Sequence, residues 1–133
     1  MWIISRLSYA IEQCETGFEN YLFPQITTAI YNFWLYELCD VYIEYVKKDL
    51  YAKEPDPRRQ ETIKLILYTC LDNGLRLLAP IMPYVSEELY QRLPKPNGGK
   101  DAPASLCVTP YPASSQVKET ILSMFSLKFI SII

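Results

Sequence analysis

Histidine is absent from this sequence of 133 residues. Without an imidazole, the chain can form neither a Ser-His-Asp nor a Cys-His catalytic arrangement, and it lacks a ligand that many zinc sites use. Glycine is scarce, and none of the four glycines lies in a phosphate-binding pattern such as G-x-G-x-x-G. The chain by itself therefore gives no support for ATP binding, and only carboxylate or lysine chemistry remains open to it.

Paired cysteines are also missing. The four cysteines stand singly, without a C-x-x-C pair, at Cys14, Cys39, Cys70 and Cys107. Neither a zinc knuckle nor a dithiol redox site is indicated by this spacing. We expect the cysteines to be buried thiols of a reduced cytoplasmic protein.

Long apolar runs are missing as well, and none comes close to the roughly 18 residues that a membrane helix needs. Glu37, Asp40 and Glu44 interrupt the richest stretch, and Arg6 lies in an N-terminal segment without a cleavage pattern. The chain is 50% hydrophobic and 21% charged, which is typical of one globular domain. We therefore expect a cytoplasmic protein with no membrane partner.

Apolar residues recur at three- and four-residue steps through most of the chain, which is the period of an α-helix. The pattern predicts long helices over about 2–18, 23–50 and 58–81, and a short helix capped by Ser86. Prolines in the segment 53–57 break the pattern and predict a loop. The inward faces are expected to include Val41, Tyr45, Leu89 and Leu93. Helices of unequal length joined in this way fit an all-α fold, an antiparallel helical bundle.

Three local features complete the expected fold. Asp72 and Arg76, four residues apart, are expected to pair on the outer side of the third helix. Residues 105–108 are expected to form a short extended segment, and the stretch from Ser114 a last helix.

Few residues have the pattern of a chemical site. Glu37, Asp40 and Glu44 share one helix face, where paired carboxylates or an oxygen-ligated metal ion are conceivable, although solvated helix surface is the favoured interpretation. The formal net charge of −2 argues against nucleic-acid binding through bulk positive potential. A local basic cluster lies around the junction of the second and third helices, diluted by acidic neighbours, and consists of Lys47, Lys48, Lys53, Arg58, Arg59 and Lys64. With 14% aromatic residues, the chain also offers rings on which unstacked bases can lie.

Ordered sequence words are more specific than these patterns. WIISRL at 2–7, FWLYELCDVYIE at 33–44 and PIMPYVSEELY at 80–90 resemble the anticodon-binding helical domain of class I aminoacyl-tRNA synthetases in order and spacing. Within that class, LYTCLD at 67–72 and SLCVTPYP at 105–112 are most similar to the valyl enzymes of eukaryotic cytoplasm. The resemblance predicts an anticodon-binding bundle over residues 1–112, incomplete at its N-terminal side, followed by a divergent tail over residues 113–133.

The resemblance implies that the chain is a fragment of a larger ligase, which joins valine to its tRNA with ATP and magnesium. The His-Ile-Gly-His and Lys-Met-Ser-Lys-Ser signatures that handle ATP in this class are absent, as is the editing domain that hydrolyses mischarged threonine. We therefore expect no catalytic residue, no metal and no cofactor in this chain. Its expected partners are the tRNA for valine and the catalytic and editing domains of the parent synthetase.

The candidate tRNA-binding residues are basic and aromatic, because phosphates attract cations and unstacked bases stack on rings. We expect phosphate contacts from Arg6, Lys47, Lys48, Arg58 and Arg59 and base stacking on Tyr9 or Phe23. For Arg6, a salt bridge to Glu37 or Asp40 across the bundle is the competing interpretation.

Two other functions stay open. The chain can be the anticodon domain of another class I synthetase, such as the isoleucyl or leucyl enzyme. Alternatively, it can be a non-catalytic helical interaction module that self-associates through exposed apolar faces, which its apolar tail would suit.

Overall fold

The computed structural model describes residues 2–52, 54, 56–95 and 103–115, and this part of the chain is built from helices without a strand. The elements in order are α1 (Trp2–Glu19), α2 (Phe23–Tyr31), the π-helical segment η1 (Asn32–Ile43), α3 (Glu44–Leu50), α4 (Pro57–Leu78), α5 (Pro83–Arg92) and the 3₁₀ turn η3 (Leu106–Val108). The prediction of an all-α fold is therefore confirmed.

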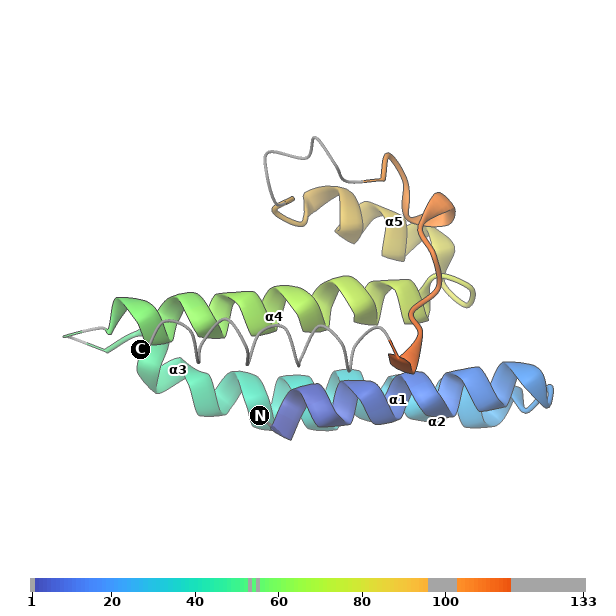
Figure 1. Cartoon of the computed structure of the whole chain (residues 1–133), viewed down its shortest axis with the longest axis horizontal. Coiled ribbons are helices and arrows are strands. Elements are labelled where there is room, and N and C mark those ends of the chain that lie inside the picture. The colour runs from blue at the N-terminus through green and yellow to red at the C-terminus, as the bar shows by residue number, and fades with distance from the viewer. Residues whose placement is uncertain (1, 53, 55, 96–102, 116–133) are drawn as a thin grey trace.

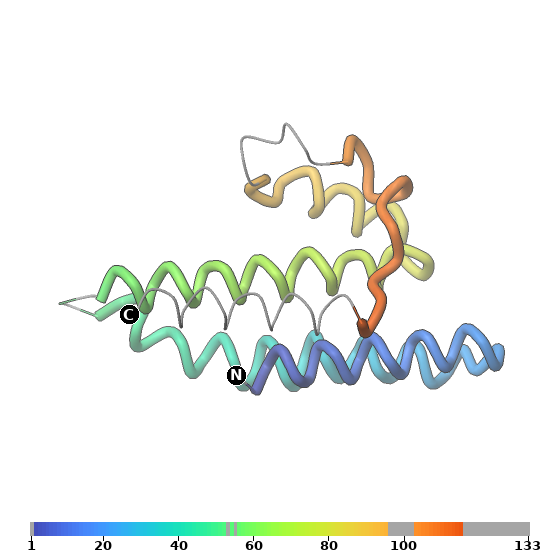
Figure 2. Tube along the Cα trace, in the orientation of Figure 1, coloured from blue at the N-terminus to red at the C-terminus, as the bar shows by residue number. Residues whose placement is uncertain are grey.

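The long helices lie side by side in alternating directions, as Figure 1 shows. The segments α2, η1 and α3 follow one another as a single rod, which runs antiparallel to both α1 and α4. The short α5 folds back over α4, on the side away from α1 (Figure 1). The Cα trace in Figure 2 shows the segment after α5 passing the end of α4 and returning to α1. The expected antiparallel bundle is thus present.

The core lies between α1, the rod and α4, and it consists of the apolar stripes that the sequence pattern indicated. Leu7, Ile11 and Cys14 of α1 are fully buried there, as are Leu38 of η1 and Cys70 of α4. Burial of an apolar side chain of this size stabilises the fold by about 1.5 to 3 kcal/mol. Packing between the helices therefore supplies most of what holds the bundle together.

The turn between α1 and α2 brings the two helices into close contact. A Cβ atom on Gly17 would lie 2.5 Å from Cγ1 of Ile26, so only glycine fits there without a shift. Tyr21 adopts φ 57°, the left-handed conformation that commonly ends a helix, and Leu22 N–H donates to the carbonyl of Gly17 at 2.7 Å. Helix α2 then begins with Pro24 in its first turn, where a missing N–H costs nothing.

The π-helical segment changes which side chains of the rod face inward. Val41 and Tyr45 were expected in the core, but they are 50% and 57% exposed, whereas Val46 is buried and Tyr42 packs against the core. A π-helix has more residues per turn than the about 3.6 of an α-helix, because its hydrogen bonds span five residues. The inward face therefore slips by one position between Leu38 and the end of η1.

Helix α4 follows the expected loop and is capped by a residue that the sequence analysis did not single out. The side chain of Asp56 accepts a hydrogen bond from Arg58 N–H at 3.0 Å, and Pro57 occupies the first turn. The helix ends at Leu78, so the prediction that it extends to Ile81 is wrong, and Ile81 is 43% exposed.

Two predictions for the short helix α5 are also wrong. The helix begins at Pro83, and Ser86 lies inside it, fully buried, with its hydroxyl donating to the carbonyl of Met82 at 2.7 Å. Because the helix starts one turn earlier than expected, Ser86 and Tyr90 form its buried face, while Leu89 is 46% exposed and Leu93 is half-buried. Hydrogen bonding to the preceding turn is a common use of serine inside a helix.

The segment after α5 is a 3₁₀ turn rather than the expected extended stretch. Ser105 Oγ accepts from Cys107 N–H at 3.2 Å, and this bond bends the backbone into η3. Glu87 Oε2 accepts from Ser105 Oγ at 2.9 Å and from Leu106 N–H at 2.8 Å, which attaches the turn to α5. The helix expected from Ser114 falls almost wholly on residues 116–133, outside the described residues.

Candidate nucleic-acid interface

Of the six basic residues expected around the helix junction, Lys53 lies outside the described residues, and Lys64 lies further along α4 and is exposed. The other four lie at one end of the bundle. Lys47 and Lys48 belong to the last turn of α3, and Arg58 and Arg59 to the first turns of α4. All four side chains are exposed. The two helices are tied together there, because Gln60 Nε2 donates to the carbonyl of Leu50 at 3.1 Å.

Acidic neighbours neutralise part of this charge. Arg59 pairs with Asp49 at 2.9 Å and Lys47 pairs with Glu44, while the ammonium of Lys48 lies 4.6 Å from the ring centroid of Tyr45. None of the ion pairs among the described residues involves Lys48 or Arg58. Among the four residues at this end of the bundle, these two cations are therefore the ones that can meet a phosphate without first breaking a salt bridge.

Arg6 lies elsewhere, and it is held by a carboxylate. Its Nε and Nη2 atoms lie 2.6 Å and 2.5 Å from Oε1 of Glu37, and its guanidinium lies 4.9 Å from the ring centroid of Tyr9. The hydrogen bond to Glu37 raises the pKa of Arg6 above its already high ordinary value. The competing interpretation of Arg6, a salt bridge across the bundle, therefore describes its contact in this structure.

Phe23 lies at the opposite end of the bundle from the basic cluster, at the start of α2 (Figure 1). The rod from Phe23 to Leu50 is about 40 Å long at about 1.5 Å per residue. The structure thus brings the basic residues of α3 and α4 together and Arg6 beside Tyr9, but it does not join all candidates in one patch.

A hollow with both polar and apolar lining lies between α1 and α2, beside Tyr9, and was not found from the sequence. Its volume is about 340 Å³, and it is lined by Tyr9, Gln13, Pro24, Gln25, Thr28, Ala29 and Asn32. Gln25 Nε2 donates to Oε1 of Gln13 at 3.0 Å and so links the two helices. The spacing of Tyr9 and Gln13 on one helix face was visible in the sequence, but their meeting with α2 depends on tertiary packing.

A second hollow, of about 300 Å³, is almost wholly apolar and lies between the rod and the end of α4. It is lined by Thr27, Ile30, Tyr31, Trp34, Leu78, Ile81 and Met82. Tyr31 and Met82 expose more than half of their surface at its edge. Such a surface suits contact with protein better than contact with phosphate.

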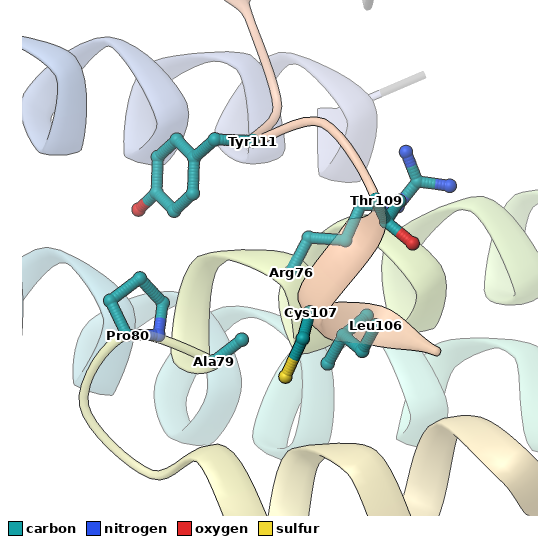
Figure 3. Close-up of a pocket in the computed structure, with 7 residues that line it drawn as sticks. All are labelled: Arg76, Ala79, Pro80, Leu106, Cys107, Thr109 and Tyr111. Carbon is teal, nitrogen blue, oxygen red and sulfur yellow. The ribbon is translucent and has the colours of Figure 1, made fainter. Parts of the chain in front are cut away.

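A third hollow, of about 310 Å³, lies where the segment after α5 crosses the end of α4. Figure 3 shows the ring of Tyr111 and Pro80 on one side of it and Cys107 and Leu106 on the other. The Tyr111 hydroxyl donates to the carbonyl of Leu77 at 3.4 Å, and the ring meets Phe18 edge to face at 5.5 Å. These contacts attach the segment to α4 and α1, so we assign this hollow a structural role.

Arg76 lines this hollow and forms the expected ion pair with Asp72 at 2.8 Å. The prediction that they lie on the outer side of the helix is wrong, because Asp72 is only 9% exposed. Burial raises the pKa of Asp72, and the charge of Arg76 opposes part of that rise.

The cysteines divide into two pairs, which corrects the expectation that all are buried. Cys14 and Cys70 are buried, and burial raises their pKa to about 11 and about 12. Cys39 and Cys107 are exposed. Cys39 lies on the solvent side of the π-helical segment, and Cys107 lies in the turn η3.

The acidic residues Glu37, Asp40 and Glu44 do not assemble into a site. Glu37 is paired with Arg6 and Glu44 with Lys47. Within the described residues no group of three or more potential ligands is placed to hold a metal ion. The helices described also include none with the length and hydropathy of a membrane span.

Comparison with known proteins shows to which class this all-α bundle belongs. A family model described as "Anticodon-binding domain of tRNA ligase" matches residues 1–133. The chain belongs to this family.

Its relatives narrow the class further. The chain is 57% identical over 118 residues to a valine–tRNA ligase of Takifugu rubripes, and these residues make up 86% of this chain and 10% of that protein. It is 55% identical over 115 residues to the valine–tRNA ligase of Homo sapiens, with 86% and 9% covered. The mitochondrial valine–tRNA ligase of Rattus norvegicus is 48% identical over 112 residues, with 84% and 10% covered. The chain therefore spans about a tenth of the length of these relatives.

Proposed function

We propose that this chain binds the anticodon stem and loop of the tRNA for valine, as part of a valine–tRNA ligase. The observation that carries the proposal is the identity of 55% to 57% with valine–tRNA ligases over 86% of the chain. The bundle supports it, because helices that present cations and exposed rings on a rigid core suit a folded RNA with an unstacked loop.

Phosphate contacts come from the basic end of the bundle in this proposal. Lys48 and Arg58 make the direct contacts, since no ion pair within the described residues occupies them. Lys47 and Arg59 add phosphate contacts when their ion pairs with Glu44 and Asp49 break. Binding of this kind releases counterions and is independent of base sequence.

Base contacts come from Tyr9, with Phe23 as the alternative ring. Tyr9 is 49% exposed and Phe23 is 58% exposed, so both rings are accessible. Arg6 keeps its salt bridge to Glu37 in this proposal and affects RNA binding indirectly, because it holds the ring of Tyr9 in position.

The reacting groups of the ligase lie outside this chain in the proposal. ATP, magnesium and valine are handled by the catalytic domain, and mischarged products by the editing domain, which are the protein partners of this bundle. The proposed location is the cytoplasm. Its support is the higher identity to the vertebrate relatives whose names carry no organelle, 55% to 57%, than to the mitochondrial rat ligase at 48%.

A binding experiment tests the proposal. The purified chain is titrated with an anticodon stem-loop RNA that carries a valine anticodon and, in parallel, with the same RNA carrying isoleucine or leucine anticodons, over a series of salt concentrations. We expect tighter binding of the valine stem-loop that persists as salt rises, because base contacts are less salt-sensitive than phosphate contacts. Preference for another anticodon would reassign the synthetase, and equal binding that fades with salt would refute anticodon recognition.

A second candidate function is self-association, and the apolar hollow beside Tyr31 and Met82 favours it. Two copies that covered this hollow would remove exposed apolar surface from water. Sedimentation across a concentration series distinguishes the candidates. A monomer at every concentration excludes self-association, and a dimer that Met82→Glu dissociates supports it.

A further inference from the structure

The hollow between α1 and α2 combines a half-exposed ring with paired side-chain amides. We infer that it is a subsite for one unstacked nucleobase of the anticodon loop, in which Tyr9 stacks on the base and Gln13 and Gln25 contact its edge. The inference rests on the proposed function, because it names the part of the surface that reads a base rather than a phosphate.

The ring of Tyr9 is held in place although about half of it, 49%, is exposed. Arg6 lies over the ring at 4.9 Å from its centroid, and two contacts fix Arg6 on Glu37. A cation over a ring attracts its π-electrons and restricts its motion. A ring that is both accessible and fixed loses little conformational entropy when a base stacks on it, which favours binding.

The hydrogen bond between the two glutamines leaves one donor and one acceptor of the pair free. Gln25 Nε2 donates to Oε1 of Gln13 at 3.0 Å and approaches the carbonyl oxygen of the same residue at 3.4 Å. These bonds use the amide nitrogen of Gln25 and the amide oxygen of Gln13. They leave the amide oxygen of Gln25 as an acceptor and the amide nitrogen of Gln13 as a donor, each with the orientation of its amide fixed.

That arrangement matches the edge of a base. RNA bases in loops are recognised through neighbouring donors and acceptors on their Watson–Crick and Hoogsteen edges, together with stacking on aromatic rings. Adenine presents an N6 amino donor beside a ring-nitrogen acceptor. It can therefore pair with the amide oxygen of Gln25 and the amide nitrogen of Gln13, one group from each glutamine.

The rest of the hollow is compatible with RNA. Its other polar lining residues are Thr28 and Asn32, so the described residues that line it include no carboxylate that would repel a phosphate backbone. Its volume of about 340 Å³ lies within the range of about 300 to 1,000 Å³ that small-molecule sites occupy. The apolar hollow beside Met82 has no such hydrogen-bonding lining.

A structural role is the competing explanation of the glutamine pair, since Gln13 and Gln25 also tie α1 to α2. The two roles have different signatures. If the pair is purely structural, its removal lowers the free energy of unfolding and weakens the binding of every RNA equally. If the pair reads a base, its removal changes the preference between bases.

The test uses the full chain and valine anticodon stem-loop RNAs in which 2-aminopurine, a fluorescent adenine analogue, replaces one loop base at a time. We expect the fluorescence of 2-aminopurine to fall on binding at one loop position, because stacking on Tyr9 quenches it. At the neighbouring positions the fluorescence should not change. Tyr9→Ala should weaken binding about 10-fold or more and abolish this fluorescence change, because a base stacked on an aromatic ring contributes that much affinity. Tyr9→Phe keeps the ring and should keep both.

The matched control is Tyr84→Ala, which removes a ring that is 91% exposed on α5, away from the hollow. This variant should bind like the unaltered chain. Gln13→Ala should reduce discrimination between RNAs that differ at the loop position whose fluorescence changes on binding. The unfolding midpoint of this variant is measured as well, to detect a loss of stability.

The outcomes separate this inference from the proposed function. If the chain binds the valine stem-loop selectively but Tyr9→Ala binds as tightly as Tyr84→Ala, the subsite is refuted and anticodon binding stands. If Gln13→Ala weakens all RNAs equally, base reading by the glutamines is refuted. If the unaltered chain binds no stem-loop, the proposed function fails and the subsite fails with it.

Discussion

The indole of Trp34 lies directly on the backbone of Gly74. A Cβ atom added at Gly74 would come within 2.8 Å of Cζ2 of Trp34, and the indole Nε1–H donates to the Gly74 carbonyl at 3.4 Å. This contact joins the π-helical segment to α4 in the middle of the bundle, and only a residue without a side chain permits it.

Gly74→Ala should therefore destabilise the fold although alanine is the better helix former. Alanine gains about 1 kcal/mol in helix propensity over glycine, while forcing an extra methyl group into a packed core costs about 1 to 3 kcal/mol. We expect a net loss of about 1 kcal/mol in the free energy of unfolding, measured by urea denaturation. Glu61→Ala, on the exposed face of the same helix, is the control and should change it little. A more stable Gly74→Ala variant would contradict the tight contact.

Removing one partner of the buried pair Asp72 and Arg76 should cost more stability than removing both. The raised pKa of Asp72 indicates that burial costs the carboxylate more than Arg76 returns. Asp72→Ala would leave a largely buried guanidinium without its partner and should cost about 2 kcal/mol. The double variant Asp72→Leu, Arg76→Met removes both charges and should be more stable than Asp72→Ala in urea denaturation. A double variant that is no more stable than Asp72→Ala would contradict this coupling.

The long helices could be predicted from the sequence because apolar spacing records the α-helical period directly. The inward face of the rod beyond Leu38 could not be predicted in the same way. A π-helical segment leaves no mark in residue types, so the stripe was extended at the α-helical period to Val41 and Tyr45 instead of Tyr42 and Val46. Packing of the whole bundle, rather than local propensity, determines which positions of the rod face the core beyond Leu38.

The same distinction applies to the candidate site. Lys48 and Arg58 flank a single loop, so their meeting at one end of the bundle follows from chain connectivity and was predictable. Tyr9 and Gln25 come from different helices, and their shared hollow depends on the angle and register of α1 against α2. Of the residues that line this hollow, the sequence analysis singled out only Tyr9 and did not indicate the glutamines that meet beside it.

The four cysteines should differ in their reactivity toward thiol reagents according to their solvent exposure. Thiolates are the reactive form, and burial keeps the pKa of Cys14 at about 11 and that of Cys70 at about 12, far above neutral pH. Cys39 and Cys107 are exposed and should react within the native protein. Titration with a thiol reagent, followed by peptide mass spectrometry, should label these two first. Labelling of Cys14 and Cys70 should require denaturant, and rapid native labelling of Cys70 would contradict its burial.

The attachment of the η3 turn to α5 should weaken in acid. Hydrogen bonds from Gln91, Ser105 and Leu106 N–H hold the pKa of Glu87 below its ordinary value near 4.5. A carboxyl with a lowered pKa in the folded state stabilises the fold above its unfolded pKa, and this contribution disappears as pH falls through the lower folded pKa. Hydrogen-exchange protection of the Leu106 amide should therefore drop below about pH 4.5. Glu87→Gln should show weaker protection that no longer varies with pH in this range. Equal protection in both proteins at every pH would exclude the carboxylate as the partner.

Lys48 and Arg58 should contribute to RNA affinity in a way that depends on salt and not on the anticodon. Neither belongs to an ion pair among the described residues, so each can neutralise one phosphate. Lys48→Ala and Arg58→Ala should each weaken binding of valine and non-valine stem-loops by the same factor. Each should also reduce the slope of log affinity against log salt by about 1. Lys95→Ala, which removes a cation that follows the C-terminal end of α5, is the matched control and should leave the slope unchanged. Loss of anticodon preference in Lys48→Ala or Arg58→Ala, with the salt slope intact, would instead place base reading at this end of the bundle.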